Sequence, residues 1–253
     1  MKRGLNLTSG TLGMAMLLVG WQVLAWVVRR PILPSPVEVF PVFVKLLPGE
    51  LGLHFAASAG RVLVSILLAV ATAAPLGLVL GQSRRLDRVF DPLIAVTYPI
   101  PKIIFLPVIY VLMGITDLSK IFLITLIIFF QILVVVRDEA AKLHSELILS
   151  VRSLGAGRRA LFRFVYLPAS IPSVLTALRV STGTAVAVLF IAEQSLTVYG
   201  LGYYIVIETY QVLRYPEMYA GIMAMSLLGL ILYVTISHLE RKTSPHRTEM
   251  ADQ

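Results

Sequence analysis

Long apolar runs alternate with short polar segments along most of the chain. A helix that crosses a bilayer needs about 20 mainly apolar residues. Every backbone N–H and C=O must find a partner inside the membrane, so runs of this length predict helices. We expect an all-α, polytopic membrane protein with a single membrane domain over residues 1–253. The six predicted spans cover residues 11–28, 61–81, 93–114, 119–136, 169–192 and 218–238.

Prolines, glycines and polar residues mark the connections between these spans. Residues 31–36 contain three prolines and cannot continue a helix, whereas residues 37–47 predict a short helix at the membrane interface. We expect a basic turn over residues 81–88 and a tight turn over residues 114–117. Residues 198–215 predict a polar, aromatic connection before the last span.

The third predicted span is interrupted by Pro99, Pro101 and Lys102. In membrane proteins a broken helix either exposes its backbone groups to a cavity or forms a packed kink. Lys102 is the only cation of this span. It either attracts an anionic solute or extends its ammonium group to the interface.

Composition and charge fit this membrane assignment. Hydrophobic residues make up 57% of the chain and charged residues 14%, well below the charged share of a soluble domain. The net charge is +8, but most of the 22 Lys and Arg residues flank the apolar runs. Their distribution predicts that both termini are cytoplasmic. The chain has no cysteine, which excludes disulfides and thiol catalysis.

Glu193 closes an uncharged stretch of the fifth predicted span. An acid at membrane depth is costly unless it faces water or a partner. Glu193 therefore either lines a polar pathway or gate, or pairs with a basic residue at the interface. Gly200 and Gly202, followed by tyrosines, predict an outer turn near such a gate, or only a loop with interfacial tyrosines.

The chain lacks the residue patterns of several kinds of chemistry. His54, His144, His238 and His246 are scattered without metal-ligand spacing, so we expect no metal site. No serine lies in a Gly-x-Ser-x-Gly turn, and we expect no catalytic residues. A glycine-rich phosphate loop is also missing, so this chain has no such means of binding ATP.

Residues 137–167 form the longest polar segment, longer than a simple connector requires. Apolar residues recur three or four positions apart on both sides of Gly155 and Gly157, and glycines permit a sharp turn. We expect two short amphipathic helices that meet at an angle and dock into a groove on a soluble partner. The arginines contact that partner or anionic lipid. The predicted docking residues are Arg152, Ser153, Leu154, Gly155, Ala156, Gly157, Leu161, Phe162, Leu167 and Pro168.

This segment resembles the cytoplasmic loop of the permease subunits of ABC importers. That loop has a glycine at its turn and, ten residues later, an aliphatic-x-Leu-Pro ending. Gly155, Val165, Leu167 and Pro168 occupy these positions, while Leu149-Ser150-Val151 replaces the Glu-Ala-Ala opening. Further similarity to the nitrate, sulfonate and taurine permeases lies at residues 33–36, 99–102, 106–107, 114–115, 192–193 and 200–203.

The resemblance implies a type I ABC importer permease fold with six transmembrane helices, in a bacterial cytoplasmic (inner) membrane. It also implies a permease homodimer, two cytoplasmic ABC ATPase subunits that bind ATP-Mg, and an extracytoplasmic substrate-binding protein. This chain would form the translocation pathway and hold no cofactor of its own. Because the acidic opening is replaced, we expect docking by shape and apolar contact around residues 154–162.

Two other classes of protein remain as alternatives. An ion-coupled secondary transporter or channel would show buried charge pairs and an internal repeat, but only Glu193 stands out in the sequence and no repeat is visible. A membrane enzyme would need a catalytic constellation. For an importer, sulfonates, taurine and nitrate are the expected substrates, and bicarbonate or pyrimidine precursors are also open.

Overall fold

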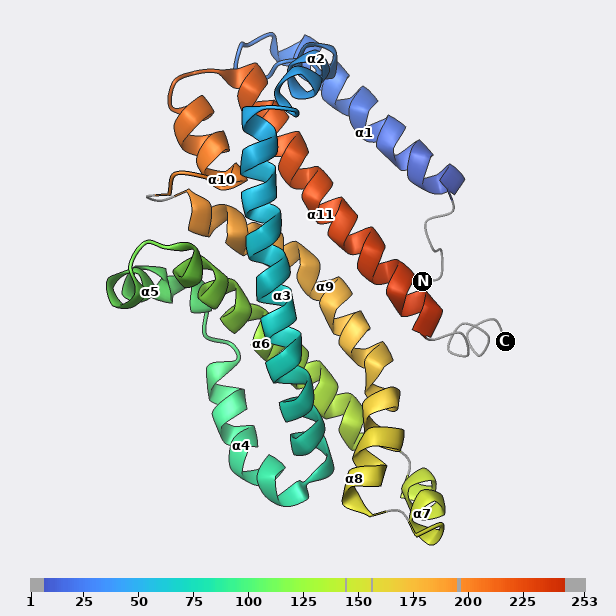
Figure 1. Cartoon of the computed structure of the whole chain (residues 1–253). Coiled ribbons are helices and arrows are strands. Elements are labelled where there is room, and N and C mark those ends of the chain that lie inside the picture. Colours follow the sequence, from blue (N-terminus) through green and yellow to red (C-terminus); the bar gives the residue numbers. More distant parts are fainter. Residues whose placement is uncertain (1–6, 144, 156, 195–196, 244–253) are drawn as a thin grey trace. The chain divides into compact units, whose positions relative to one another are not determined.

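The computed structural model describes residues 7–143, 145–155, 157–194 and 197–243, and every regular element in these ranges is a helix (Figure 1). The all-α prediction is confirmed. Among the described residues, five helices are long and apolar enough to cross a membrane, and a bent pair supplies a sixth crossing if it counts as one span. The five are Gly10–Val28, Glu50–Gln82, Asp117–Ala141, Arg159–Glu193 and Tyr215–Thr243, and the pair is Arg84–Thr97 with Lys102–Met113.

The described chain divides into two compact units. The first draws on residues 1–58 and 193–227, and the second on residues 59–192 and 228–253. Helices α3 (Glu50–Gln82) and α11 (Tyr215–Thr243) each contribute residues to both units. We describe each unit separately.

Several helices extend beyond the predicted spans. Helix α3 begins at Glu50 instead of residue 61, α6 (Asp117–Ala141) continues beyond residue 136, and α11 ends at Thr243 instead of residue 238. Polar residues lower the hydropathy at a helix end without breaking the backbone hydrogen bonds. Hydropathy therefore marks the part of a helix that suits the bilayer, and it underestimates the helix itself.

In the first unit, α1 (Leu7–Val28) and α2 (Pro36–Leu46) are joined by the proline-rich segment. The predicted short helix after that segment is confirmed. Ser35 and Glu38 form a capping box, in which Glu38 Oε2 accepts from the Ser35 N–H and Ser35 Oγ accepts from the Glu38 N–H. The indole Nε1 of Trp21 donates to the Pro34 carbonyl at 3.0 Å, and its ring stacks on Tyr219. These contacts hold the C-terminal half of α1 against α2 and α11.

The segment after Gly200, predicted as a polar connection, is instead helical. It contains α10 (Leu201–Tyr203) and the π-helix η3 (Tyr204–Tyr210). Tyr204, Ile205 and Thr209 are buried. Gly221 of α11 makes this packing possible, because a Cβ there would lie 2.7 Å from the Ile205 side chain. The prediction missed this helix because polar residues such as Glu208 and Thr209 interrupt its apolar repeat.

In the second unit, α3 packs closely against α6. Gly77 and Gly81 lie one turn apart on α3. A Cβ on Gly77 would be 3.0 Å from the Leu133 carbonyl oxygen, and one on Gly81 would meet the Arg137 carbonyl and lie 2.7 Å from the Ala140 Cβ. Small residues at this spacing let two membrane helices approach closely. The buried core of the unit includes Ala69, Leu78, Leu123, Ile124, Ile128, Ile132, Val136, Ala185 and Leu189.

The predicted basic turn over residues 81–88 is wrong, because α4 (Arg84–Thr97) already begins at Arg84. The Ser83 hydroxyl accepts from the Leu86 N–H and caps this helix. Arg137 of α6 pairs with Asp91 of α4 at 2.9 Å. The basic residues of the segment therefore lie on a helix that an ion pair ties to α6.

The third predicted span is broken, as expected. After α4 the chain forms a short 3₁₀ helix, η1 (Lys102–Phe105), and then α5 (Leu106–Met113), and the two halves meet at 78°. Gly114, at φ +73°, ends α5, and the Thr116 hydroxyl caps α6. The predicted tight turn is thus confirmed. The remaining helices are α7 (Ser145–Ser153), α8 (Arg158–Leu161), the π-helix η2 (Phe162–Tyr166) and α9 (Leu167–Glu193).

Candidate functional site

The predicted docking elbow begins with α7 and turns at Gly155. The Gly155 N–H donates to the Arg152 carbonyl at 2.9 Å, and Ser153 Oγ donates to the Ser150 carbonyl at 2.7 Å. Gly155 has φ +83°, a region that favours glycine. Figure 1 shows α7 and α8 on the two sides of this turn. The predicted glycine turn is present, while Ala156 lies outside the described residues.

The second arm of the elbow differs from the prediction, because it is not a separate short helix. Residues Arg159–Glu193 form one continuous helix through α8, η2 and α9. Pro168 lies inside it, although the prediction treated this proline as the end of the loop. Proline cannot donate a backbone hydrogen bond. The helix widens just before it, so that the Leu167 N–H donates to Phe162 O in π-helical geometry.

Exposure separates the predicted docking residues into two groups. Leu154 is 85% exposed, and Arg152, Ser153, Gly157 and Pro168 are exposed as well. Leu161 is only 2% exposed and packs inside the second unit, so its predicted place on the docking surface is wrong. Phe162 is half-buried, and Leu167 is 43% exposed. The exposed apolar surface of the elbow therefore consists mainly of Leu149, Leu154 and Phe164.

A second candidate site surrounds Glu193 in the first unit. Glu193 is fully buried, and the Ser58 hydroxyl lies 2.7 Å from its Oε2 and 2.9 Å from its Oε1. The Gly202 N–H donates to Oε2 at 3.0 Å, and the Leu201 N–H donates to Ser58 Oγ at 2.8 Å. These N–H groups begin the helix of α10 and η3, where a carboxylate is electrostatically favourable. Glu193 is therefore buried and held by hydrogen bonds, which argues against a place at an exposed interface, and its role at a gate stays a prediction.

Gly200 connects the Glu193 site to a group that sequence reasoning missed. His54 Nδ1 lies 3.0 Å from the Gly200 N–H and 3.1 Å from its carbonyl oxygen. His54 Nε2 lies 3.1 Å from Glu208 Oε2. Burial raises the pKa of Glu208, and the nearby Glu50 carboxylate adds to this effect against the opposing influence of His54. A sequence signal existed, since Glu50, His54 and Ser58 are spaced four apart and share one face of a helix.

The broken span forms a third candidate site, in the second unit. Lys102 Nζ donates to the carbonyls of Thr97, Tyr98 and Ile100 at 2.9, 3.1 and 3.2 Å, and lies 4.3 Å from the centre of the Phe130 ring. Lys102 therefore caps the end of α4. The break borders a cavity of about 390 Å³. This favours a broken helix that exposes backbone groups to a cavity over a packed kink. Its lining includes Pro99, Pro101, Lys102, Phe130, Gln131 and Thr184.

Other charged residues are buried besides Glu193. Arg61 is 6% exposed and its Nη2 lies 2.7 Å from Asp117 Oδ1. Lys120 is 1% exposed and lies 3.9 Å from the same oxygen. The sequence interpretation that only Glu193 stands out was therefore incomplete. It missed Arg61 because that residue lies at the edge of a predicted span, and Lys120 because one charge in an apolar run hardly changes the hydropathy.

Comparison with known proteins identifies the class. Residues 73–245 match the family described as binding-protein-dependent transport system inner membrane component. The chain belongs to this family, and it is a permease subunit of an ABC transporter, a membrane-spanning transport subunit without catalytic activity of its own. The family works with ATPase and substrate-binding-protein partners. The sequence-based expectation of an ABC importer permease is confirmed, and the alternatives of a secondary transporter, a channel or a membrane enzyme are set aside.

Individual relatives agree with this class. The chain is 29% identical to the taurine transport system permease protein TauC of Escherichia coli (strain K12), over 99% of this chain and 93% of TauC. It is 28% identical to the formylaminopyrimidine transport permease protein ThiX of Halalkalibacterium halodurans, over 98% of this chain and 99% of ThiX. Among solved structures, it resembles a chain of the inward-facing MetNI methionine ABC transporter, with a TM-score of 0.63 and 20% identity. That match covers 77% of this chain and 96% of the other, and it supports the predicted fold.

Proposed function

We propose that this permease imports a small sulfonate such as taurine. It works as a homodimer with two ABC ATPase subunits that hold ATP-Mg and a binding protein on the outer face, and both of its termini are cytoplasmic. The similarity to a taurine permease over nearly the whole length of both chains supports the substrate class. The proposal also includes nitrate as an inorganic substrate.

One observation carries the coupling mechanism: the glycine turn leads directly into a long membrane helix. Leu154 at the turn is exposed, and Arg159–Glu193 is continuous. When the ATPases close on ATP, they move the elbow as a rigid body. Because α8, η2 and α9 form one helix, this movement reaches Glu193 without an intervening loop. The Glu193 carboxylate in turn accepts from the Gly202 N–H in α10.

The broken span and its cavity fit a place on the pathway. Backbone carbonyls that a bent helix frees are tolerated in a membrane where they line a polar cavity. Lys102 satisfies three of these carbonyls and adds a positive charge beside Gln131 and Thr184. A positive charge beside neutral polar groups suits an anionic solute. The carboxylate of Glu193 repels a sulfonate or nitrate group and already accepts from Ser58 and Gly202, so we assign Glu193 a holding role and not a substrate contact.

Transport by the reconstituted system tests this proposal. The permease, its ATPase and its binding protein are placed in proteoliposomes, and uptake of labelled taurine, nitrate and formylaminopyrimidine is measured with and without ATP. We expect ATP-dependent uptake of taurine that unlabelled alkanesulfonates inhibit. Uptake of formylaminopyrimidine alone would overturn the substrate class and leave the class of transporter intact.

A further inference from the structure

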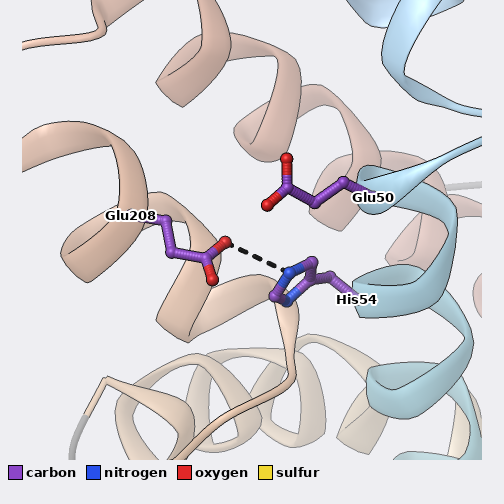
Figure 2. A group of neighbouring side chains, drawn as sticks. All are labelled: Glu50, His54 and Glu208. Carbon is purple, nitrogen blue, oxygen red and sulfur yellow. Dashed lines mark ion pairs between the residues drawn. The ribbon is translucent and has the colours of Figure 1, made fainter.

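Three side chains that can bind a metal converge in the first unit, as Figure 2 shows. Glu50 and His54 lie one turn apart at the start of α3, and Glu208 approaches them from η3. One ligand atom from each of the three lies within 4.8 Å of the other two. No motif of the sequence joins Glu208 to the other two residues, so only the packing of η3 against α3 creates this group.

His54 is held rigidly in the orientation that a metal ligand needs. It is 2% exposed, and the rings of Tyr204 and Tyr199 lie 5.2 and 5.7 Å from its own. Metal-binding histidines use the second ring nitrogen for a hydrogen bond that fixes the ring. Here Nδ1 faces both the N–H and the carbonyl of Gly200. The Gly200 backbone can therefore support either tautomer, including the one that leaves the Nε2 lone pair free.

Glu208 places a carboxylate oxygen opposite His54. Its Oε2 is a buried oxygen without a hydrogen-bond donor in the described structure, although it lies 3.1 Å from His54 Nε2. A buried carboxylate oxygen without a donor is unfavourable. The Nε2–H tautomer of His54 directs its N–H toward this oxygen, whereas with the Nδ1–H tautomer two lone pairs face each other across this distance. A cation bound by both atoms removes that conflict.

We propose that Glu50, His54 and Glu208 form a binding site for a divalent transition metal ion of the Zn²⁺ class. One imidazole nitrogen and two carboxylates suit such ions, and the two negative charges balance the ion. Ligand atoms around Zn²⁺ lie roughly 3.3–3.5 Å apart, so the group must contract slightly. Glu50 is exposed and can make this adjustment, and its side leaves a path for the ion and for bound water.

The bound ion would join α3 to η3. The first residues of the helix that contains η3 are already held by Ser58 and Glu193. The metal would fix the same helix at a second point, two turns further along. The site lies in the first unit, whereas the elbow belongs to the second.

Zinc binding to the purified complex tests the proposal. The full transporter, purified without a histidine tag, is stripped with EDTA, dialysed against micromolar Zn²⁺ with millimolar Mg²⁺ as competitor, and analysed for bound zinc. We expect wild-type permease to bind zinc. Glu208→Gln and Glu50→Gln should bind it with an affinity lower by roughly tenfold or more. Zinc should also raise the Tm of the wild-type complex and leave that of Glu208→Gln unchanged.

Glu217→Gln is the matched control, because Glu217 is a carboxylate of the same unit outside the group. We expect this variant to bind zinc as the wild type does. His54 is not substituted, since its loss would also remove the contact with Gly200. Equal zinc binding by wild type and Glu208→Gln, or no saturable zinc at all, would overturn the site. Loss of zinc in Glu217→Gln as well would place the ion elsewhere and overturn it too.

Discussion

At the scale of single residues, Glu193 is the clearest case of a charge with a defined task. A fully buried carboxylate in a membrane protein requires donors. Glu193 finds them in the Ser58 hydroxyl and the Gly202 N–H. The Ser58 hydroxyl also accepts from the Leu201 N–H, so Ser58 and Glu193 together satisfy the first N–H groups of α10.

Glu193→Gln should assemble normally and transport more slowly. The amide keeps one acceptor oxygen, but it loses the charge that strengthens both hydrogen bonds, at a cost of about 1–2 kcal/mol. We expect uptake in vesicles to fall severalfold while the yield of purified complex stays unchanged. Glu217→Gln serves as the control for loss of a carboxylate from the same unit. Wild-type uptake by Glu193→Gln would show that the charge is dispensable.

Gly155→Pro should uncouple ATP hydrolysis from transport. Proline holds φ near −65°, while Gly155 has φ +83°, so the turn between α7 and α8 cannot form. We expect ATPase activity to persist without substrate uptake, measured on the same proteoliposomes. Gly60→Ala, in α3 and outside the elbow, is the control, because a Cβ there would meet nothing within 4 Å. Coupled transport by the proline variant would remove Gly155 from the mechanism.

Leu149→Glu should be tolerated. Leu149 occupies the replaced opening of the family loop and is 61% exposed, so a charge there needs no burial. Leu161→Glu is the contrasting variant, because Leu161 is 2% exposed and a buried unpaired charge is costly. We expect near-wild-type uptake from the first variant and loss of folded protein from the second. A strong defect in Leu149→Glu would mean that the apolar residue itself contacts the ATPase.

At the scale of elements, the packing of α3 on α6 depends on two glycines. Gly81→Ala places a methyl group 2.7 Å from the Ala140 Cβ and against the Arg137 carbonyl, so backbone atoms must move. Such overpacking costs about 1–3 kcal/mol. We expect a lower Tm and less folded permease in detergent, by fluorescence-detected size exclusion.

Gly60→Ala tests the same substitution where space is available. Gly60 also lies in α3, and a Cβ there would meet nothing within 4 Å. Replacing glycine by alanine inside a helix favours the helix by roughly 0.5–1 kcal/mol when nothing clashes. We therefore expect Gly81→Ala to lower the Tm and Gly60→Ala to raise it. A similar decrease in Tm for both would indicate that helix packing is not the cause.

At the scale of the whole molecule, the absence of cysteine makes the proposed orientation easy to test. Ser153 and Pro48 are both exposed and lie in the elbow and between α2 and α3, respectively. With cytoplasmic termini, a membrane-impermeant maleimide should label Pro48→Cys in spheroplasts and Ser153→Cys only after lysis. The reverse pattern would contradict the orientation that the basic residues predict.

Helix α1 has few contacts with the rest of its own chain. Among its described side chains, residues 10–28, only Ala25 is buried. An apolar helix with so little contact inside its own chain suits a lipid environment, in which apolar exposure has no cost. Its sequence alone therefore sufficed to predict a span, since the prediction needed no tertiary partner.

The sequence by itself determined the class of fold and the position of the glycine turn at Gly155. Apolar runs of bilayer length and fixed turn residues such as Gly155 act locally, and a local constraint can be read from the sequence. Helix ends were less predictable, because the backbone continues through polar residues.

Only the tertiary structure decided which polar groups meet. Glu193 meets Ser58 across more than a hundred intervening residues, and His54 meets Glu208 in the same way. No residue spacing encodes these pairs, because they arise from the packing of helices distant in sequence. Burial likewise decided that Leu161 packs inside while Leu154 stays exposed, although both are leucines of the same elbow. A hydrophobic pattern shows which residues avoid water, and only the fold shows what covers them.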